Sequence, residues 1–311
     1  MDKKNLKFTI PIVLFVLTIV LVLNNRPDDA FTTFFLMFGY IFFFIVFKRD
    51  GLEDDEDTGD TTISSKRNIS KTPYYVYYGD ELNFSDEELT RILNKRFPYF
   101  NKLDQIQKNI FLERLQKFIA AKTFKIHEGN GFKEMPVLIS AAAIQLTFGL
   151  KKYLLPHFEF IHIYPQEFMR VRPIICFLEG NVSGQAINLS WKHFLEGYAN
   201  SNDGQNVGLH ELAHALYYQT FGVEENVDKN FRDQYDEFIT DSNKAYHTEK
   251  SSTGGLYSEY AEKNSQEFWA ESIELFFEKP ADMNRTYPRL YSSLKNLLNQ
   301  DPLNKTASMT G

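Results

Sequence analysis

The chain has 311 residues, a formal net charge of -7 at pH 7 and a single cysteine, Cys176. This acidic balance offers no basic face to nucleic acid, so no nucleic-acid partner is expected. One cysteine cannot build an intramolecular disulfide framework, which agrees with a reducing compartment. The sequence also has no internal repeat, no phosphate-binding glycine loop and no paired-cysteine metal site.

Two apolar segments near the N-terminus, residues 8–23 and 30–47, are separated by a short polar loop. Each segment is close to the length that spans a bilayer core. A cleavable signal peptide is the alternative for the first segment, but no small-residue cleavage site follows it and the second segment begins at once. The sequence therefore predicts a two-helix transmembrane hairpin over residues 1–49.

Positive charges flank this hairpin at its outer ends. Three lysines precede residues 8–23, and Lys48 and Arg49 follow residues 30–47, whereas the loop contains only Arg26. Lysine and arginine close to a span tend to remain cytoplasmic. The expected protein is thus integral to the inner (cytoplasmic) membrane, with the rest of the chain facing the cytoplasm.

Residues 50–72 are acidic and nearly free of large apolar side chains, which predicts a flexible linker. Residues 73–311 are predicted to be one α+β domain in which helices dominate. Ser85 with Glu88 forms a capping box at the start of a helix, and apolar residues recur at helical spacing from 103 to 119.

Three short β-favouring segments, at residues 158–163, 173–178 and 184–189, predict a small, mostly antiparallel sheet. Residues 184–189 are the expected exposed edge, where an extended substrate could add a strand. Cys176 falls in the second segment and is expected to be a buried strand residue.

The most informative motif is His210-Glu211-Leu212-Ala213-His214, in a segment with apolar residues at helical spacing. Residues four apart share one face of a helix, so His210 and His214 can supply two ligands to a catalytic Zn²⁺. Glu211 can take a proton from a metal-bound water. A core helix with merely hydrogen-bonded histidines is the alternative, but burying these groups without an ion would be costly. The motif predicts a site that hydrolyses peptide bonds.

The residues after this motif bear on the third zinc ligand. Tyr217 and Thr220 stand where a metzincin requires glycine and histidine, which excludes that class. The other common solution is a glutamate on a later helix, and residues 267–277 combine three glutamates with aromatic and aliphatic neighbours.

Among these glutamates, Glu267 suits the ligand position. Glu271, one turn later, suits a second carboxylate that orients a zinc-bound imidazole. Solvent-facing helix charge is the alternative for Glu271 and Glu274. His247 is the rival third ligand, although its surroundings are polar. The remaining histidines considered, His157, His162 and His193, have no partner at ligand spacing and are expected to be surface or strand residues.

These motifs belong to a longer pattern that resembles the Mlc titration factor A (MtfA) family of zinc-dependent metallopeptidases, itself distantly similar to the catalytic domain of anthrax lethal factor. The resemblance covers roughly residues 97–303. It is carried by residues 135–143, 161–168, 189–191 and 206–214, by Tyr260-Ala261, Glu267 and Phe276-Phe277, and by Pro280, Pro288 and Asp301-Pro302-Leu303.

The resemblance implies a helix-rich, gluzincin-type zincin fold with His210, His214 and Glu267 as zinc ligands. It also implies that Glu211 is the general base and that Tyr260 assists at the transition state. The chain departs from the family before Glu267, where the usual proline is absent, and over residues 221–259, which match poorly. Cleavage specificity, and the choice between amino- and endopeptidase, therefore do not transfer.

The sequence best fits a membrane-anchored zinc peptidase acting on peptide or protein substrates, and other functions are alternatives. As the family name implies, the domain could mainly capture a regulatory protein such as a transcription factor, with a mainly structural zinc. Retention of Glu211 favours catalysis, because a structural zinc needs no base. The additional family matches argue against a structural membrane protein, and the sequence distance of His210 from both apolar segments argues against an intramembrane protease.

Overall fold

The computed structural model describes residues 75–127, 132–170, 176–223, 229–250, 255–259, 261 and 264–304. The chain divides into two units, Met1–Ile69 and Ser70–Gly311, and every described residue lies in the second unit. The predicted transmembrane hairpin and acidic linker fall outside the described residues. Within the described ranges, no helix combines the length and apolar character that crossing a membrane requires.

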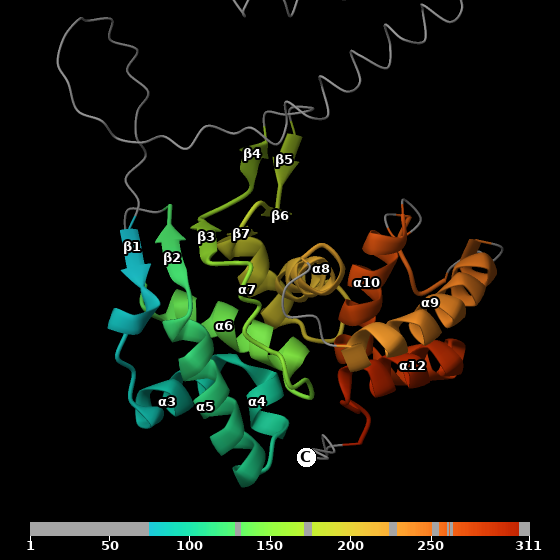
Figure 1. The fold of residues 1–311 in the computed structure, drawn as a ribbon, viewed down its shortest axis with the longest axis horizontal. Helices are drawn as coiled ribbons and strands as arrows, with labels where there is room; N and C mark the ends of the chain where they lie inside the picture. The colour runs from blue at the N-terminus through green and yellow to red at the C-terminus, as the bar shows by residue number, and fades with distance from the viewer. Residues whose placement is uncertain are drawn as a thin grey trace, which may run out of the picture. The chain divides into compact units, whose positions relative to one another are not determined.

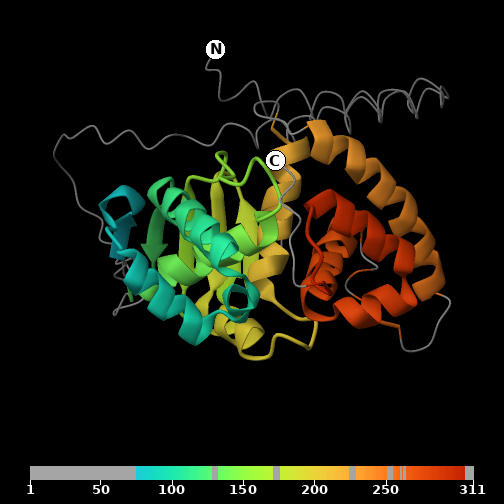
Figure 2. The same ribbon diagram turned by 90° about the horizontal axis from the view of Figure 1, so that it is seen from below.

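Four helices lie on one side of the main sheet (Figures 1 and 2), namely α3 (Asp86–Arg96), α4 (Pro98–Lys102), α5 (Gln105–Ala120) and α6 (Glu134–Thr147). The predicted capping box is confirmed, since Glu88 N donates to Ser85 Oγ at 3.2 Å and Ser85 N donates to Glu88 Oε2 at 3.3 Å. A second box, formed by Asp104 and Gln107, opens α5. Local side-chain caps thus fix where the first long helices begin.

The main sheet has the strand order β1-β2-β3-β7-β6. Its strands are β1 (Tyr75–Tyr78), β2 (Thr123–Ile126), β3 (Phe160–Tyr164), β6 (Gly180–Ser183) and β7 (Ala186–Ser190). The β2, β3 and β7 strands run parallel, and β1 and β6 pair antiparallel at the two edges. The expectation of a mostly antiparallel sheet is therefore wrong at the sheet's centre. The chain passes through α6 between β2 and β3, and long crossovers of this kind join parallel strands.

The expected edge strand is also corrected. Residues 184–189 mostly form β7, which lies inside the sheet between β3 and β6, so β6 is the edge on that side. Ser183 pairs with Ala186 across a two-residue turn. Gly184 has φ +55° there, a conformation that two-residue hairpin turns require and that glycine adopts without strain.

A separate two-stranded antiparallel sheet is formed by β4 (Phe168–Arg170) and β5 (Cys176–Leu178), and we call it the β4/β5 ribbon. It stands beyond the main sheet in Figure 1. Cys176 lies in a strand, as predicted, but it is half-buried rather than buried. The short strands of the ribbon leave too few neighbours to cover its side chains.

The remaining helices are α7 (Trp191–Ala199), α8 (Val207–Phe221), α9 (Lys229–Lys250), α10 (Ser265–Glu278), α11 (Pro280–Thr286) and α12 (Pro288–Leu298). The α8 helix lies between the sheet with its helices and the group formed by α9, α10 and α12 (Figures 1 and 2). It packs against α6, α10, β6 and β7. The helices expected around the histidine motif and around residues 267–277 are confirmed as α8 and α10.

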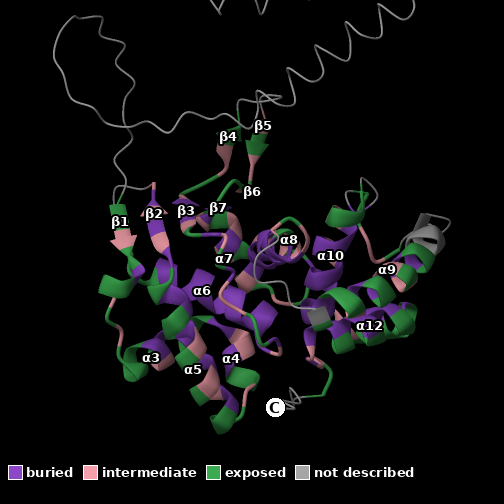
Figure 3. Ribbon diagram, in the orientation of Figure 1, coloured by how far each residue is buried: buried purple, intermediate pink, exposed green. Residues whose placement is uncertain are grey.

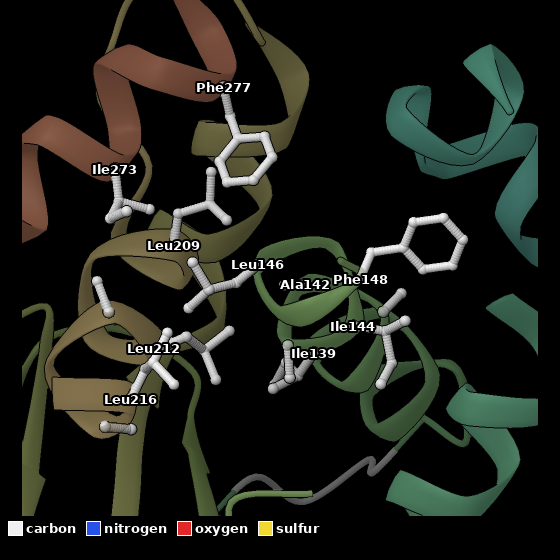
Figure 4. Close-up of a cluster of buried hydrophobic side chains, with 14 of the residues drawn as sticks. Ile139, Ala142, Ile144, Leu146, Phe148, Leu209, Leu212, Leu216, Ile273 and Phe277 are labelled. Carbon is white, nitrogen blue, oxygen red and sulfur yellow. The ribbon is translucent and has the colours of Figure 1, made fainter. Parts of the chain in front are cut away.

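The core lies between these layers, where buried residues gather along α6, α8 and α10 (Figure 3). Leu209, Leu212 and Leu216 of α8 face α6 and α10 in Figure 4. Trp269 of α10 is fully buried, and its Nε1 donates to Ala213 O at 2.8 Å. Burial of the apolar stripe of α8 orients the helix, and the indole bond sets the position of α10 along it.

Candidate active site

The first turn of α8 is held by Asn206. Its Oδ1 accepts a hydrogen bond from Leu209 N at 3.0 Å, and its carbonyl oxygen accepts one from His210 N at 2.9 Å. An asparagine at this N-cap position satisfies donors that the helix leaves unpaired. The backbone that carries His210 is therefore fixed at the start of the helix.

Three side chains predicted as zinc ligands converge in the structure. One donor atom each from His210, His214 and Glu267 lies within 4.8 Å of the other two. Glu267 Oε2 is 3.1 Å from His210 Nε2 and 3.3 Å from His214 Nε2, and the two Nε2 atoms are 3.2 Å apart. Bonds of about 2.0–2.1 Å to a tetrahedral zinc would put its ligand atoms roughly 3.3 Å apart, so these residues fit the ion.

The electrostatics of this cluster favour a positive charge. Burial alone lowers the pKa of His210, but its hydrogen bonds with Glu267 and Glu274 raise it to about 10. Burial raises the pKa of Glu267, and its contacts with His210 and His214 outweigh that and lower it to about 2. The carboxylates thus stabilise a cation at this point, which is the role a divalent ion would fill.

Glu211 follows His210 on the same turn of α8, and its side chain is buried. Burial raises its pKa to about 7, against the opposing effect of His210. The backbone of β6 passes directly beside it, since a Cβ built on Gly180 would lie 2.5 Å from Glu211 Cγ. The carboxylate is therefore held between α8 and the edge strand β6.

The contact expected from Glu271 is made instead by Glu274, one turn further along α10. Glu274 Oε1 is 2.7 Å from His210 Nδ1, and its other oxygen accepts a hydrogen bond from Asn206 N. Glu271 accepts hydrogen bonds from Ser258 N at 2.6 Å and Ser258 Oγ at 2.9 Å. Both glutamates share a helix face with Glu267, and the packing of α10 on α8 brings the later one to the imidazole.

Two predictions concern Tyr260 and the side chain of His247, which lie outside the described part of the structure. Tyr260 lies outside the described residues, so its role at the transition state stays a prediction. The backbone of His247 belongs to α9, and its side chain is not described. The preference for Glu267 over His247 as the third ligand therefore rests on the position of Glu267 beside His210 and His214.

The other histidines have ordinary partners. His162 lies on β3, and its Nδ1 is 3.1 Å from His127 Nε2. His157 Nε2 is 3.2 Å from Gly184 O. His193 is on α7, in contact with glutamates including Glu167, and it lines the cavity described below. The expectation of surface or strand positions fits His157 and His162, whereas His193 has a place on the cavity wall.

Sequence reasoning missed a set of hydrogen bonds that hold the starts of α8 and α10, the helices that carry the candidate ligands. Glu278 Oε1 accepts a hydrogen bond from Asn206 Nδ2 at 2.9 Å, and Glu278 Oε2 accepts one from Gly204 N at 3.0 Å. The side chain of Asn264 caps α10 by accepting from Glu267 N at 3.0 Å. Two signals in the sequence could have indicated these contacts. An asparagine immediately precedes each of the helices α8 and α10, and Glu278 lies on the same face of α10 as Glu267 and Glu274.

A cavity of about 740 Å³ opens onto this cluster. Its wall includes His210 and Glu211 of α8, Glu274 of α10, Gly180 at the edge strand and Phe177 of the β4/β5 ribbon. Further acidic residues on the wall are Glu179, Glu196, Asp203 and Glu271. A ligand in the cavity can thus contact the Glu211 carboxylate and the His210 ring together.

Comparison with known proteins agrees with the resemblance seen in the sequence. Residues 81–298 match the family described as "Glucose-regulated metallo-peptidase M90". The chain is also similar to the uncharacterized protein slr2042 of Synechocystis sp., with 27% identity over 234 residues that cover 68% of this chain and 83% of that protein. Because the family match spans well over half of the sequence, the chain belongs to the M90 family of glucose-regulated metallopeptidases.

Proposed function

We propose that this protein is a zinc-dependent peptidase in which His210, His214 and Glu267 bind the metal and Glu211 is the general base. The observation that carries the proposal is the convergence of three ligand atoms within 4.8 Å, beside a buried carboxylate on a cavity wall. Family membership supports a metallopeptidase. The arrangement of donors supports zinc, because two imidazoles and a carboxylate are a common zinc ligand set in hydrolases.

A bound Zn²⁺ supplies Lewis-acid polarisation of the scissile carbonyl and of water. Glu211 accepts the proton of the attacking water as the new C–O bond forms, and it returns a proton to the amine as the C–N bond breaks. Glu274 holds the His210 ring through Nδ1, so Nε2 faces Glu267 and His214.

The same geometry suggests how an extended substrate lies in the cavity. The edge strand β6 has an unpaired side in the described sheet, and its first residue, Gly180, touches Glu211. A peptide that adds to β6 through main-chain hydrogen bonds would pass across this carboxylate. We therefore assign substrate alignment to β6 in place of residues 184–189.

Membrane anchoring stays part of the proposal on the strength of the sequence. Residues 1–49 contain two apolar segments of spanning length, and the lysines and arginines beside them favour a cytoplasmic peptidase domain. A reporter fused to the C-terminus should give a cytoplasmic signal. An extracytoplasmic signal would reverse the assigned orientation.

The experiment that tests the peptidase function uses the full chain in detergent. Cleavage of a quenched peptide library should stop on chelation and return on addition of Zn²⁺. Glu211→Gln should keep the metal and lower turnover by about 10²- to 10⁴-fold, the usual contribution of a general base. A wild type that binds zinc and cleaves no peptide, while binding a protein partner equally well with Glu211→Gln, would support the regulatory-capture function instead.

A further inference from the structure

The β4/β5 ribbon presents an apolar pair to solvent. Met169 and Phe177 are direct cross-strand partners, so their side chains share one face of the ribbon. They are 57% and 73% exposed. On the other face Phe168 pairs with Leu178, and its ring stacks on Tyr164 with a centroid distance of 4.4 Å. The ribbon therefore packs through Phe168 and leaves the Met169–Phe177 pair uncovered. Exposed segments are seen on both of its strands, β4 and β5, in Figure 3.

This apolar pair is continuous with the candidate active site. Phe177 and Leu178 line the same cavity as His210 and Glu211. Gly180, which touches Glu211, comes only three residues after Phe177. An extended chain covers about 10 Å in three residues. A polypeptide aligned on β6 and crossing Glu211 would thus reach Phe177 within a few of its own residues.

Exposure of one large apolar side chain is ordinary on a protein surface, as the case of Ile106 shows. Ile106 is 74% exposed at the start of α5, and it is not among the residues that line the cavity. Phe177 differs because it lines the cavity that also holds His210 and Glu211, and Met169 is its direct cross-strand partner. Apolar surface beside a cavity is typical of a site that binds a partner.

We propose that Met169 and Phe177 form a docking surface for a bulky apolar side chain of the polypeptide substrate, a few residues from the bond that is cut. This inference rests on the proposed peptidase function and gives it a substrate preference. The occupant is an extended chain, because the surface is continuous with the edge strand that can pair with one. Leucine, methionine or phenylalanine at the matching substrate position would cover both side chains.

The test compares Phe177→Ser and Met169→Ser with Ile106→Ser in the full chain. Each residue is exposed, so the three variants should fold like the wild type. The substrates are one cleaved peptide and a series in which leucine or serine stands at successive positions on either side of the cut bond. The wild type should prefer leucine over serine at one position by roughly 10-fold in kcat/KM, as one apolar contact gives.

Phe177→Ser and Met169→Ser should remove most of that preference, and Ile106→Ser should keep it. A short peptide that ends before the docking surface should be cut equally by all four proteins. The inference is overturned if the preference persists in both ribbon variants, or if Ile106→Ser loses it equally.

Binding separates this inference from the peptidase function. Glu211→Gln and its double variant with Phe177→Ser are titrated with the same labelled peptides, and fluorescence anisotropy is measured. If the leucine preference appears in binding and depends on Phe177 while no protein cleaves, the docking surface stands and the peptidase function fails. If the two proteins bind leucine and serine peptides alike, the docking surface fails whatever the turnover.

Discussion

Gly180 and Glu211 are in such close contact that a methyl group on the glycine would lie 2.5 Å from Cγ and 2.8 Å from Oε1 of the carboxylate. Gly180→Ala should fold, because the glutamate side chain can move aside, but the general base would then be misplaced. We expect kcat to fall by about 100-fold with zinc still bound, since a displacement of about 1 Å costs that much. Ser183→Ala, on the same strand and exposed, is the control. Normal turnover by Gly180→Ala would remove Glu211 from the proposed role.

Glu267→Gln replaces the anionic ligand with a neutral one and should weaken zinc retention more than any other single change on α10. The dissociation constant should rise by more than the 10- to 100-fold typical of losing an outer partner of a ligand. Competition with a chromogenic chelator measures this constant. Gln266→Glu, which changes charge on the adjacent exposed residue, should leave it close to wild type. Equal zinc affinity in wild type and Glu267→Gln would return His247 to consideration as the third ligand.

Glu274→Gln and Glu271→Gln form a matched pair, because both remove one carboxylate from the same face of α10. Glu274 contacts His210 Nδ1 at 2.7 Å, so Glu274→Gln should weaken zinc binding by about 10- to 100-fold. Glu271→Gln should instead loosen the segment held through Ser258. Zinc titrations of the two variants measure their dissociation constants and show which glutamate orients the His210 ring. A larger loss of affinity in Glu271→Gln would restore Glu271 to the orienting role.

Glu278 predicts a dependence of stability on pH. Burial raises its pKa to about 7, the hydrogen bond from Asn206 opposes this, and Asp203 and Glu274 add to the rise. Its folded pKa lies above the unfolded value of about 4.3, so its stabilising contribution is complete below that value and is lost as pH rises through about 7. Denaturant unfolding between pH 5 and 8 should show a steeper decline for wild type than for Glu278→Gln. Parallel curves for the two proteins would contradict the raised pKa.

Local signals predicted the helices of the site well. The motif spacing puts His210 and His214 on one face of a helix, and an asparagine marks the start of α8. The same periodicity put Glu267, Glu271 and Glu274 on one face of α10. Helical periodicity could not show which of these carboxylates contacts His210, because that depends on how α10 packs against α8. The contacts that fix this packing join residues more than fifty positions apart in the sequence.

The sheet was harder to predict for a similar reason. Edge strand β6 reads Gly180-Asn-Val-Ser183, with almost none of the alternating apolar pattern that marks a half-buried strand. Its place is fixed by pairing with β7 and by contact with α8. The parallel centre likewise follows from crossovers through α6 and through the segment between β3 and β7. Strand direction is a property of those connections rather than of the strand sequences.

Trp269, with its ring nitrogen bonded to the carbonyl of Ala213, has a practical consequence. Its indole bridges the two helices that carry the three donor side chains, and the protein has only one other tryptophan. In a Trp191→Phe background, emission from this fluorophore would report how tightly those helices pack as ions are exchanged. The molecule thus contains its own optical probe, at a position where no external dye could be inserted without opening the core.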